Sequence, residues 1–157
     1  MIIHTRVDER LIHGQVATIW TNMLNVDRIY VANDKAWQDE MTLNALKMAK
    51  PSGVKLTVSS LRRAIENFRN HRFSEERVFL IVKDIPDLET LVDGLDIREA
   101  NLGNISKHGD SESIKNSVSL TKQEIEMIEA MIAKGVKITA QMVPSEQNVS
   151  VEKYFKS

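Results

Sequence analysis

The segment Arg6–Val16, RVDERLIHGQV, gathers residue types that suit phosphoryl chemistry. Four ionisable side chains precede an apolar pair, a histidine and a glycine. His13 supplies a ring nitrogen that is nucleophilic at neutral pH and can carry a covalent adduct. Arg10, three residues earlier, offers a planar fork of donors that matches phosphate oxygens. The spacing is compatible with a phosphohistidine, and also with a surface or helix-capping histidine whose neighbouring arginine only pairs with Asp8 or Glu9.

The residues around His13 favour an anion. A helix is expected from Gln15, and unpaired N–H groups together with the helix dipole attract negative charge at a helix start. Gly14 would let the backbone approach an anion closely because it has no side chain. Asp8 is a candidate to orient an imidazole N–H or to cap the turn. The candidate set is therefore His13 as nucleophile, Arg10 for phosphate stabilisation, Asp8 as orienter, and Gly14 and Gln15 for phosphate binding.

Composition excludes several other functions. A net charge of −1 over 157 residues argues against a nucleic-acid-binding protein, because no bulk positive field can neutralise phosphates. The absence of cysteine excludes disulfides, thiolate nucleophiles and cysteine-bound metals. The four histidines, at positions 4, 13, 71 and 108, form no zinc-type pair, so neither a metal nor a cofactor is expected. The glycine-rich motifs of nucleotide-dependent enzymes are also missing.

Targeting signals are absent from the sequence as well. The N-terminus has no basic region followed by an apolar run, and no apolar stretch approaches the length of a membrane span. We therefore expect a cytoplasmic protein, with a peripheral role at a membrane left open.

The elements that must position these residues alternate along the chain. Strands are expected at IIHTRV (2–7), DRIYVAND (27–34), VKLTVS (54–59), VFLIV (78–82), REANLG (98–103) and VKITAQMV (136–143). Helices are expected at Gln15–Leu24, Trp37–Ala49, 61–68 and Asp87–Val92, from the capping box at Thr121 to Gly135, and at 151–155. This order predicts one α/β domain over residues 1–157, with a mostly parallel central sheet covered by helices on both faces.

A parallel sheet would bring the loops that follow its strands to one edge, where ligands bind. These loops are Asp8–Gly14, Asn33–Asp34, Ser59–Ser60, Lys83–Asp84, Gly103–Ser117 and Pro144–Ser145. Most are polar in the ordinary manner of surface loops. Gly103–Ser117 is expected to be a long polar loop with hinges at Gly103 and Gly109. It could fold over His13 or dock a partner through Lys107 and His108, or it could be a solvated insertion.

The motif RVDERLIHGQV resembles the active-site segment of the enzyme IIB components of the mannose/fructose/sorbose family of bacterial sugar phosphotransferase systems. The stretch RIYVANDKAWQDEMTLNALKMAKPSGVK is similar to the family's second strand and following helix. RVFLIVKD and EANLGN match later family positions more loosely. The resemblance covers almost the whole chain and implies an α/β fold with a largely parallel sheet.

This resemblance also implies a mechanism. The family's phosphorylated histidine corresponds to His13, which would accept a phosphoryl group from a phosphohistidine on a partner IIA protein or domain, through Nδ1. The group would then pass to a sugar arriving through the membrane IIC and IID components. The family's phosphate-binding arginine corresponds to Arg10. His13 is expected to be an exposed loop side chain, because two partners must reach it in turn.

Alternatives remain open at this point. The chain could be a non-catalytic α/β module that binds a sugar phosphate or a nucleotide. Mannose, fructose, sorbose and amino sugars are all candidates for the sugar, and the sequence pattern leaves open whether the protein forms a homo-oligomer.

Overall fold

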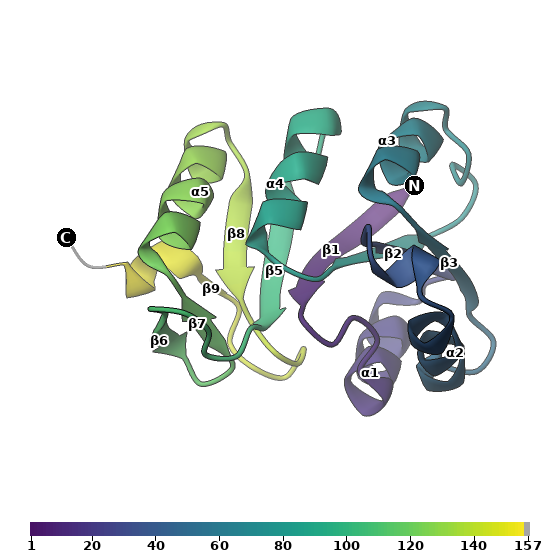
Figure 1. Ribbon diagram of the computed structural model, residues 1–157, viewed down its shortest axis with the longest axis horizontal. Helices are drawn as coiled ribbons and strands as arrows, with labels where there is room; N and C mark the ends of the chain where they lie inside the picture. Colours follow the sequence, from purple (N-terminus) through teal and green to yellow (C-terminus); the bar gives the residue numbers. More distant parts are fainter. Residues whose placement is uncertain (156–157) are drawn as a thin grey trace.

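A seven-stranded sheet organises the molecule in the computed structural model, which describes residues 1–155 (Figure 1). The strands lie in the order β3-β2-β4-β1-β5-β8-β9, and every ladder is parallel except the one between β8 and β9. Their bounds are β1 (Ile2–Asp8), β2 (Arg28–Ala32), β3 (Lys55–Ser59), β4 (Val78–Val82), β5 (Glu99–Asn104), β8 (Lys137–Ala140) and β9 (Val149–Ser150). The predicted α/β class and mostly parallel sheet are confirmed.

Two apolar cores lie on opposite faces of this sheet. One core contains buried residues of α1 (Gly14–Leu24) and α2 (Glu40–Ala49). The other contains buried residues of α3 (Leu61–Arg69), α4 (Ile85–Gly94) and α5 (Lys122–Ala133). All five residues of β4 are buried, and its successive side chains enter alternate cores. This explains why its sequence, VFLIV, is apolar without alternation.

The chain connections change direction at the carboxyl end of β1. This strand leads into α1 on one face, whereas its neighbour β4 leads into α4 on the other. The connections therefore diverge at the end of β1, which is where ligands bind in open α/β sheets. The loop that carries His13 leaves the sheet at this point.

Several predicted boundaries differ from those observed. The fourth helix starts at Ile85, before the predicted Asp87, because Asp84 is its N-cap and accepts a hydrogen bond from the Asp87 N–H. The segment predicted as one helix from Trp37 is divided into a short 3-10 helix, Ala36–Gln38, and α2. The last parallel strand ends at Ala140, and the predicted C-terminal helix is a 3-10 turn, Val151–Tyr154.

The prediction of a loop over Gly103–Ser117 is wrong in two respects. Strand β6 (Glu112–Lys115) lies within it and pairs antiparallel with β7 (Val118–Leu120). Gly103 belongs to β5 and is not a hinge. A Cβ atom at Gly103 would lie 2.0 Å from Cζ of the buried Arg6, so this glycine makes room for a guanidinium.

Gly103→Ala is therefore expected to destabilise the fold. The added methyl group meets a guanidinium fixed by several buried contacts, and overpacking of this kind costs about 1–3 kcal/mol. Urea unfolding measures the change. The matched control is Gly14→Ala, because no heavy atom lies within 4 Å of a Cβ at that position. An unchanged unfolding midpoint for Gly103→Ala would mean that Arg6 moves freely.

His4 makes the stability sensitive to acid. Its ring stacks on Trp20 with centroids 4.7 Å apart, and burial, assisted by Arg6, lowers its pKa from 6.5 to about 4. As pH falls from 6.5 toward about 4, His4 binds a proton in the unfolded chain but stays neutral in the folded protein. The free energy of unfolding should therefore fall by about 2 kcal/mol between roughly pH 7 and pH 5.

His4→Phe keeps the aromatic stack and removes the titrating group. We expect this variant to lose about 2 kcal/mol less than the parent over the same pH change. Urea unfolding at both pH values tests this, with the exposed His71 changed to Asn as the control. Equal losses in the parent and in His4→Phe would rule out His4 as the acid-sensitive group.

Candidate functional site

The loop between β1 and α1 holds a constrained backbone. The Leu11 N–H donates to the Asp8 carbonyl oxygen at 2.9 Å, and the Arg10 N–H donates to Asp8 Oδ1 at 2.9 Å. Leu11 has a φ of 59°, in the left-handed region that apolar residues rarely adopt. The side chains of Leu11 and Ile12 are each only 5% exposed, and this burial offsets the strain.

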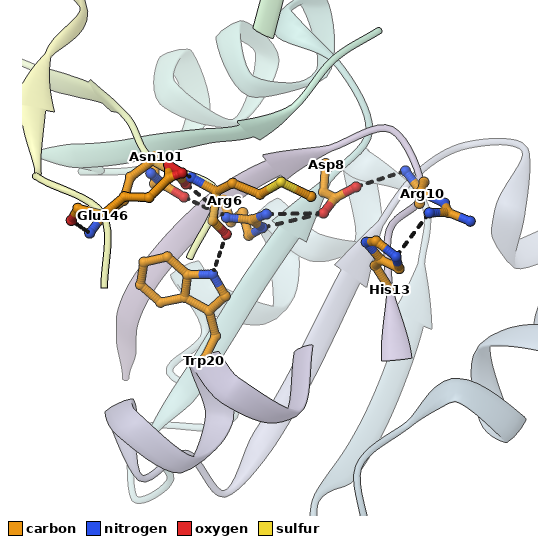
Figure 2. Close-up of polar contacts among 9 residues, drawn as sticks. Arg6, Asp8, Arg10, His13, Trp20, Asn101 and Glu146 are labelled. Carbon is orange, nitrogen blue, oxygen red and sulfur yellow. Dashed lines mark hydrogen bonds and ion pairs between the residues drawn. The ribbon is translucent and has the colours of Figure 1, made fainter. Parts of the chain in front are cut away.

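His13 and Arg10 meet in this loop. Arg10 Nη1 lies 2.8 Å from His13 Nε2 (Figure 2). A guanidinium can only donate, so Nε2 accepts, and the proton of the neutral imidazole is assigned to Nδ1. Nδ1 is enclosed and has no hydrogen-bond partner among residues 1–155. Arg10 and His13, two of the residues that the sequence singled out, are therefore in direct contact.

The exposure of His13 differs from the expectation. Arg10 is exposed, but His13 is half-buried and is therefore less accessible than an exposed loop side chain. It follows two buried residues and is itself the N-cap of α1, which begins at Gly14, one residue before the predicted start. Its position at the helix start leaves only part of the ring open to a partner.

The start of α1 is free to bind an anion. Its first backbone hydrogen bond runs from the Ala17 N–H to the His13 carbonyl oxygen at 2.9 Å. Across the described part of the chain, the N–H groups of Gly14, Gln15 and Val16 have no backbone acceptor. The first turn contains no acidic residue that would repel an anion. A phosphoryl group on His13 would thus meet free donors and the positive end of the helix dipole.

Asp8 does not contact the imidazole in this structure. Its side chain is 1% exposed, and its Oδ2 pairs with Arg6 Nη2 at 3.2 Å. Its other oxygen accepts the N–H of Arg10, which lies four residues before Gly14, the first residue of α1. Asp8 is therefore engaged with the loop backbone and with Arg6, neither orienting the histidine ring nor capping α1.

Two further residues attach the loop to the rest of the fold, and sequence reasoning missed both. Glu9 Oε1 accepts hydrogen bonds from the Ser106 N–H at 2.8 Å and from its Oγ at 2.9 Å. Arg6, inside β1, is 2% exposed. An arginine inside a predicted strand, two residues before an aspartate on the same face, was the available sign of a buried ion pair.

The segment after β5 touches the loop without covering His13. Ser106 contacts Glu9, and the next residues turn toward α5, where His108 Nε2 lies 2.9 Å from Glu124 Oε1. His108 Nδ1 lies 2.8 Å from the Ser106 carbonyl oxygen, and this contact, together with Glu124, raises the pKa of His108. Lys107 is exposed. The basic residues of this segment thus do not reach the imidazole.

Polar residues in the other loops at this edge have structural roles. Ser60 and Asp84 accept hydrogen bonds from the first turns of α3 and α4, and Asp34 accepts the Leu61 N–H at 2.9 Å. The interpretation of these loops as ordinary polar surface loops therefore fits the structure. Within residues 1–155 there is no group of three or more side chains that could hold a metal ion. The same residues include no helix that is long and apolar enough to cross a bilayer.

Comparison with known proteins identifies the family. A family model described as the sorbose subfamily IIB component of the phosphotransferase system matches residues 2–157. The chain belongs to this IIB family. It is 33% identical over 147 residues to the sorbose-specific IIB component of Klebsiella pneumoniae, covering 93% of this chain and 90% of that protein.

Two further similarities concern the fold and the arrangement of domains. The crystal structure of the IIB domain of the sorbose permease from Klebsiella pneumoniae superposes with a TM-score of 0.92 at 32% identity, covering 98% of this chain and 95% of that one. The mannose-specific EIIAB component of Escherichia coli K12 is 32% identical over 147 residues. That match covers 93% of this chain but only 46% of the longer relative. This chain is thus similar to one part of a protein whose name combines IIA and IIB.

Proposed function

We propose that this IIB component is a phosphoryl relay. His13 accepts a phosphoryl group from a phosphohistidine on a IIA protein or domain and transfers it to a sugar imported by membrane IIC and IID components. The observation that carries the proposal is the 2.8 Å contact between Arg10 Nη1 and His13 Nε2 at the free start of α1. The combined IIAB name of the mannose relative supports IIA as the donor. The relay would work at the cytoplasmic side of the transporter.

Both steps of the relay exchange one bond to phosphorus for another. In acceptance, a His13 nitrogen attacks phosphorus while the donor P–N bond breaks and its electron pair returns to the donor imidazole. In delivery, a sugar hydroxyl oxygen attacks phosphorus while the P–N bond to His13 breaks. The electron pair of that bond returns to the His13 imidazole, which takes up the proton that the hydroxyl loses. Neither step needs an oxidant. The protein therefore contributes positioning and stabilisation of charge on the transferred oxygens.

We further propose that the His13 ring turns before it accepts the phosphoryl group at Nδ1. Nδ1 is enclosed while Nε2 faces Arg10, so rotation about the side-chain bonds would expose Nδ1. Once Nε2 is released from Arg10, the ring proton would pass through water from Nδ1 to Nε2, which leaves Nδ1 with the electron pair that attacks phosphorus. The same rotation would release the Arg10 guanidinium for the phosphoryl oxygens. Arg10, Gly14 and Gln15 would then hold the anion through one charged side chain and backbone donors. A tighter clamp would stabilise the intermediate and slow delivery.

A reconstituted phosphorylation reaction tests the proposal. The protein is incubated with phosphoenolpyruvate, enzyme I, HPr and the matching IIA, and its mass is measured without acid treatment. We expect a gain of one phosphoryl group that is lost in acid, and nitrogen NMR of the labelled product should place it on Nδ1. A module that merely binds a sugar phosphate or a nucleotide would acquire no covalent phosphate, and that result would refute the relay.

A further inference from the structure

The buried Arg6 guanidinium joins three segments behind the loop that carries His13. It pairs with Asp8 at the end of β1, Nη1 donates to Asn101 Oδ1 of β5 at 2.8 Å, and Nη1 also donates to the Gln141 carbonyl oxygen after β8 at 3.1 Å. Figure 2 shows Arg6 between Asn101 and Asp8, with Arg10 and His13 beyond Asp8. One guanidinium therefore connects the loop to the two strands on one side of β1.

Burial makes this connection rigid. Arg6 and Asp8 are 2% and 1% exposed, so water does not compete for their contacts. The absence of a side chain at Gly103 leaves space for the guanidinium, and Arg6 Cζ lies 5.5 Å from the ring centroid of Trp20. The indole Nε1–H in turn donates to the Met142 carbonyl oxygen at 2.9 Å. The guanidinium is held on several sides and cannot turn away from Asp8 without breaking buried contacts.

The two carboxylate oxygens of Asp8 have different hydrogen-bond partners. Oδ2 faces Arg6, and Oδ1 accepts the Arg10 backbone N–H at 2.9 Å. This second bond fixes the residue whose side chain contacts His13. Arg6 also compensates the carboxylate charge, so that Asp8 does not repel a phosphoryl group nearby. Without Arg6, the Asp8 side chain would be free to rotate, and its negative charge would repel the phosphoryl group.

We propose that Arg6 and Asp8 are positioning residues for phosphoryl transfer, acting through the Arg10 backbone without touching the phosphoryl group. This inference rests on the proposed relay function. Removal of the pair should misplace the Arg10 guanidinium, and a displacement of about 1 Å can slow a positioned reaction by about 100-fold. The surface that a IIA partner contacts should stay unchanged, because both side chains are buried.

Asp8→Asn provides the main test, because it keeps the shape of the side chain and removes the charge that faces Arg6. Arg6→Lys provides the second, since a single ammonium group cannot reach Asp8, Asn101 and Gln141 together. The matched controls are Asp96→Asn and Arg98→Lys. This pair has the same sequence spacing and a 3.4 Å contact, but its side chains are 82% and 81% exposed.

The first measurement is hydrogen exchange of the Arg10 amide in unphosphorylated protein, which does not depend on the relay. In the parent this amide should exchange at least about tenfold more slowly than those of Gly14 and Gln15, and the main variants should lose most of that protection. Rapid exchange of the Arg10 amide in the parent would overturn the proposal even if both variants failed to fold.

The second measurement separates kcat from KM for phospho-IIA. We expect Asp8→Asn and Arg6→Lys to lower kcat at least about tenfold with KM nearly unchanged, and the controls to match the parent. A raised KM at normal kcat, or normal kinetics in a folded variant, would overturn the positioning role. If the parent itself accepts no phosphate, the relay function fails instead, and the exchange result still decides whether the pair fixes Arg10.

Discussion

His13→Ala is expected to abolish phosphoryl acceptance from phospho-IIA. The alanine side chain has no nucleophilic nitrogen, and the remaining three histidines lie elsewhere in the fold. The protein should stay folded, because among the described residues 1–155 the His13 side chain has one hydrogen-bond partner, the exposed Arg10. Time-resolved mass measurement of the phosphorylated protein gives the rate, and urea unfolding confirms that the variant is intact.

A second histidine variant provides the control for this experiment. His71 is exposed and has a φ of 56°, which asparagine tolerates better than most residues, so His71→Asn should preserve both fold and phosphorylation. Phosphorylation of His13→Ala at the parent rate would show that another residue accepts the group.

Arg10→Lys is expected to slow transfer by roughly 30- to 1000-fold, which corresponds to about 2–4 kcal/mol of lost transition-state stabilisation. Lysine keeps the charge but has one compact ammonium group instead of a planar fork. The Arg10 backbone, which Asp8 holds, is unaffected by this change. Single-turnover transfer from phospho-IIA measures the effect on chemistry separately from product release.

The control for Arg10→Lys is Arg62→Lys on α3. Arg62 has a side chain 91% exposed, and its 3.5 Å contact with Glu66 lies on a solvated helix face. That variant should transfer at the parent rate. If Arg10→Lys also transferred normally, the guanidinium would be an ordinary surface group and the contact with His13 would have no catalytic meaning.

The architecture was predictable because local signals agreed with each other. The fully apolar VFLIV strand, the capping box at Thr121 and Glu124, and the helical spacing after Ser60 all appear as the sequence indicated. The β6–β7 hairpin was missed because its strands are very short and β6, ESIK, is mostly polar. Val118 and Leu120 of β7 are buried in the core that also contains residues of α5 and β5, and the local sequence pattern does not reveal this packing.

In the candidate site, contacts between residues close in sequence could be predicted, whereas contacts between distant segments could not. The contact between Arg10 and His13 joins residues three apart, so spacing alone could suggest it. The hydrogen bonds from Arg6 to Asn101 and from Ser106 to Glu9 join segments that are distant in sequence. They depend on β1 and β5 being neighbours in the sheet, which strand alternation does not specify. For the same reason Gly103 resembled a hinge until its place against Arg6 was known.

Peptide mapping of the phosphorylated protein tests most directly whether the phosphoryl group resides on His13. Trypsin cleaves after lysine and arginine, and in this sequence it places the four histidines on four separate peptides. His13 lies alone on 11–28, whereas His108 lies on 108–115. After digestion at alkaline pH, we predict that the acid-labile phosphate is found on the peptide 11–28 and on no other. Phosphate on the peptide 108–115, or on any peptide other than 11–28, would contradict the account.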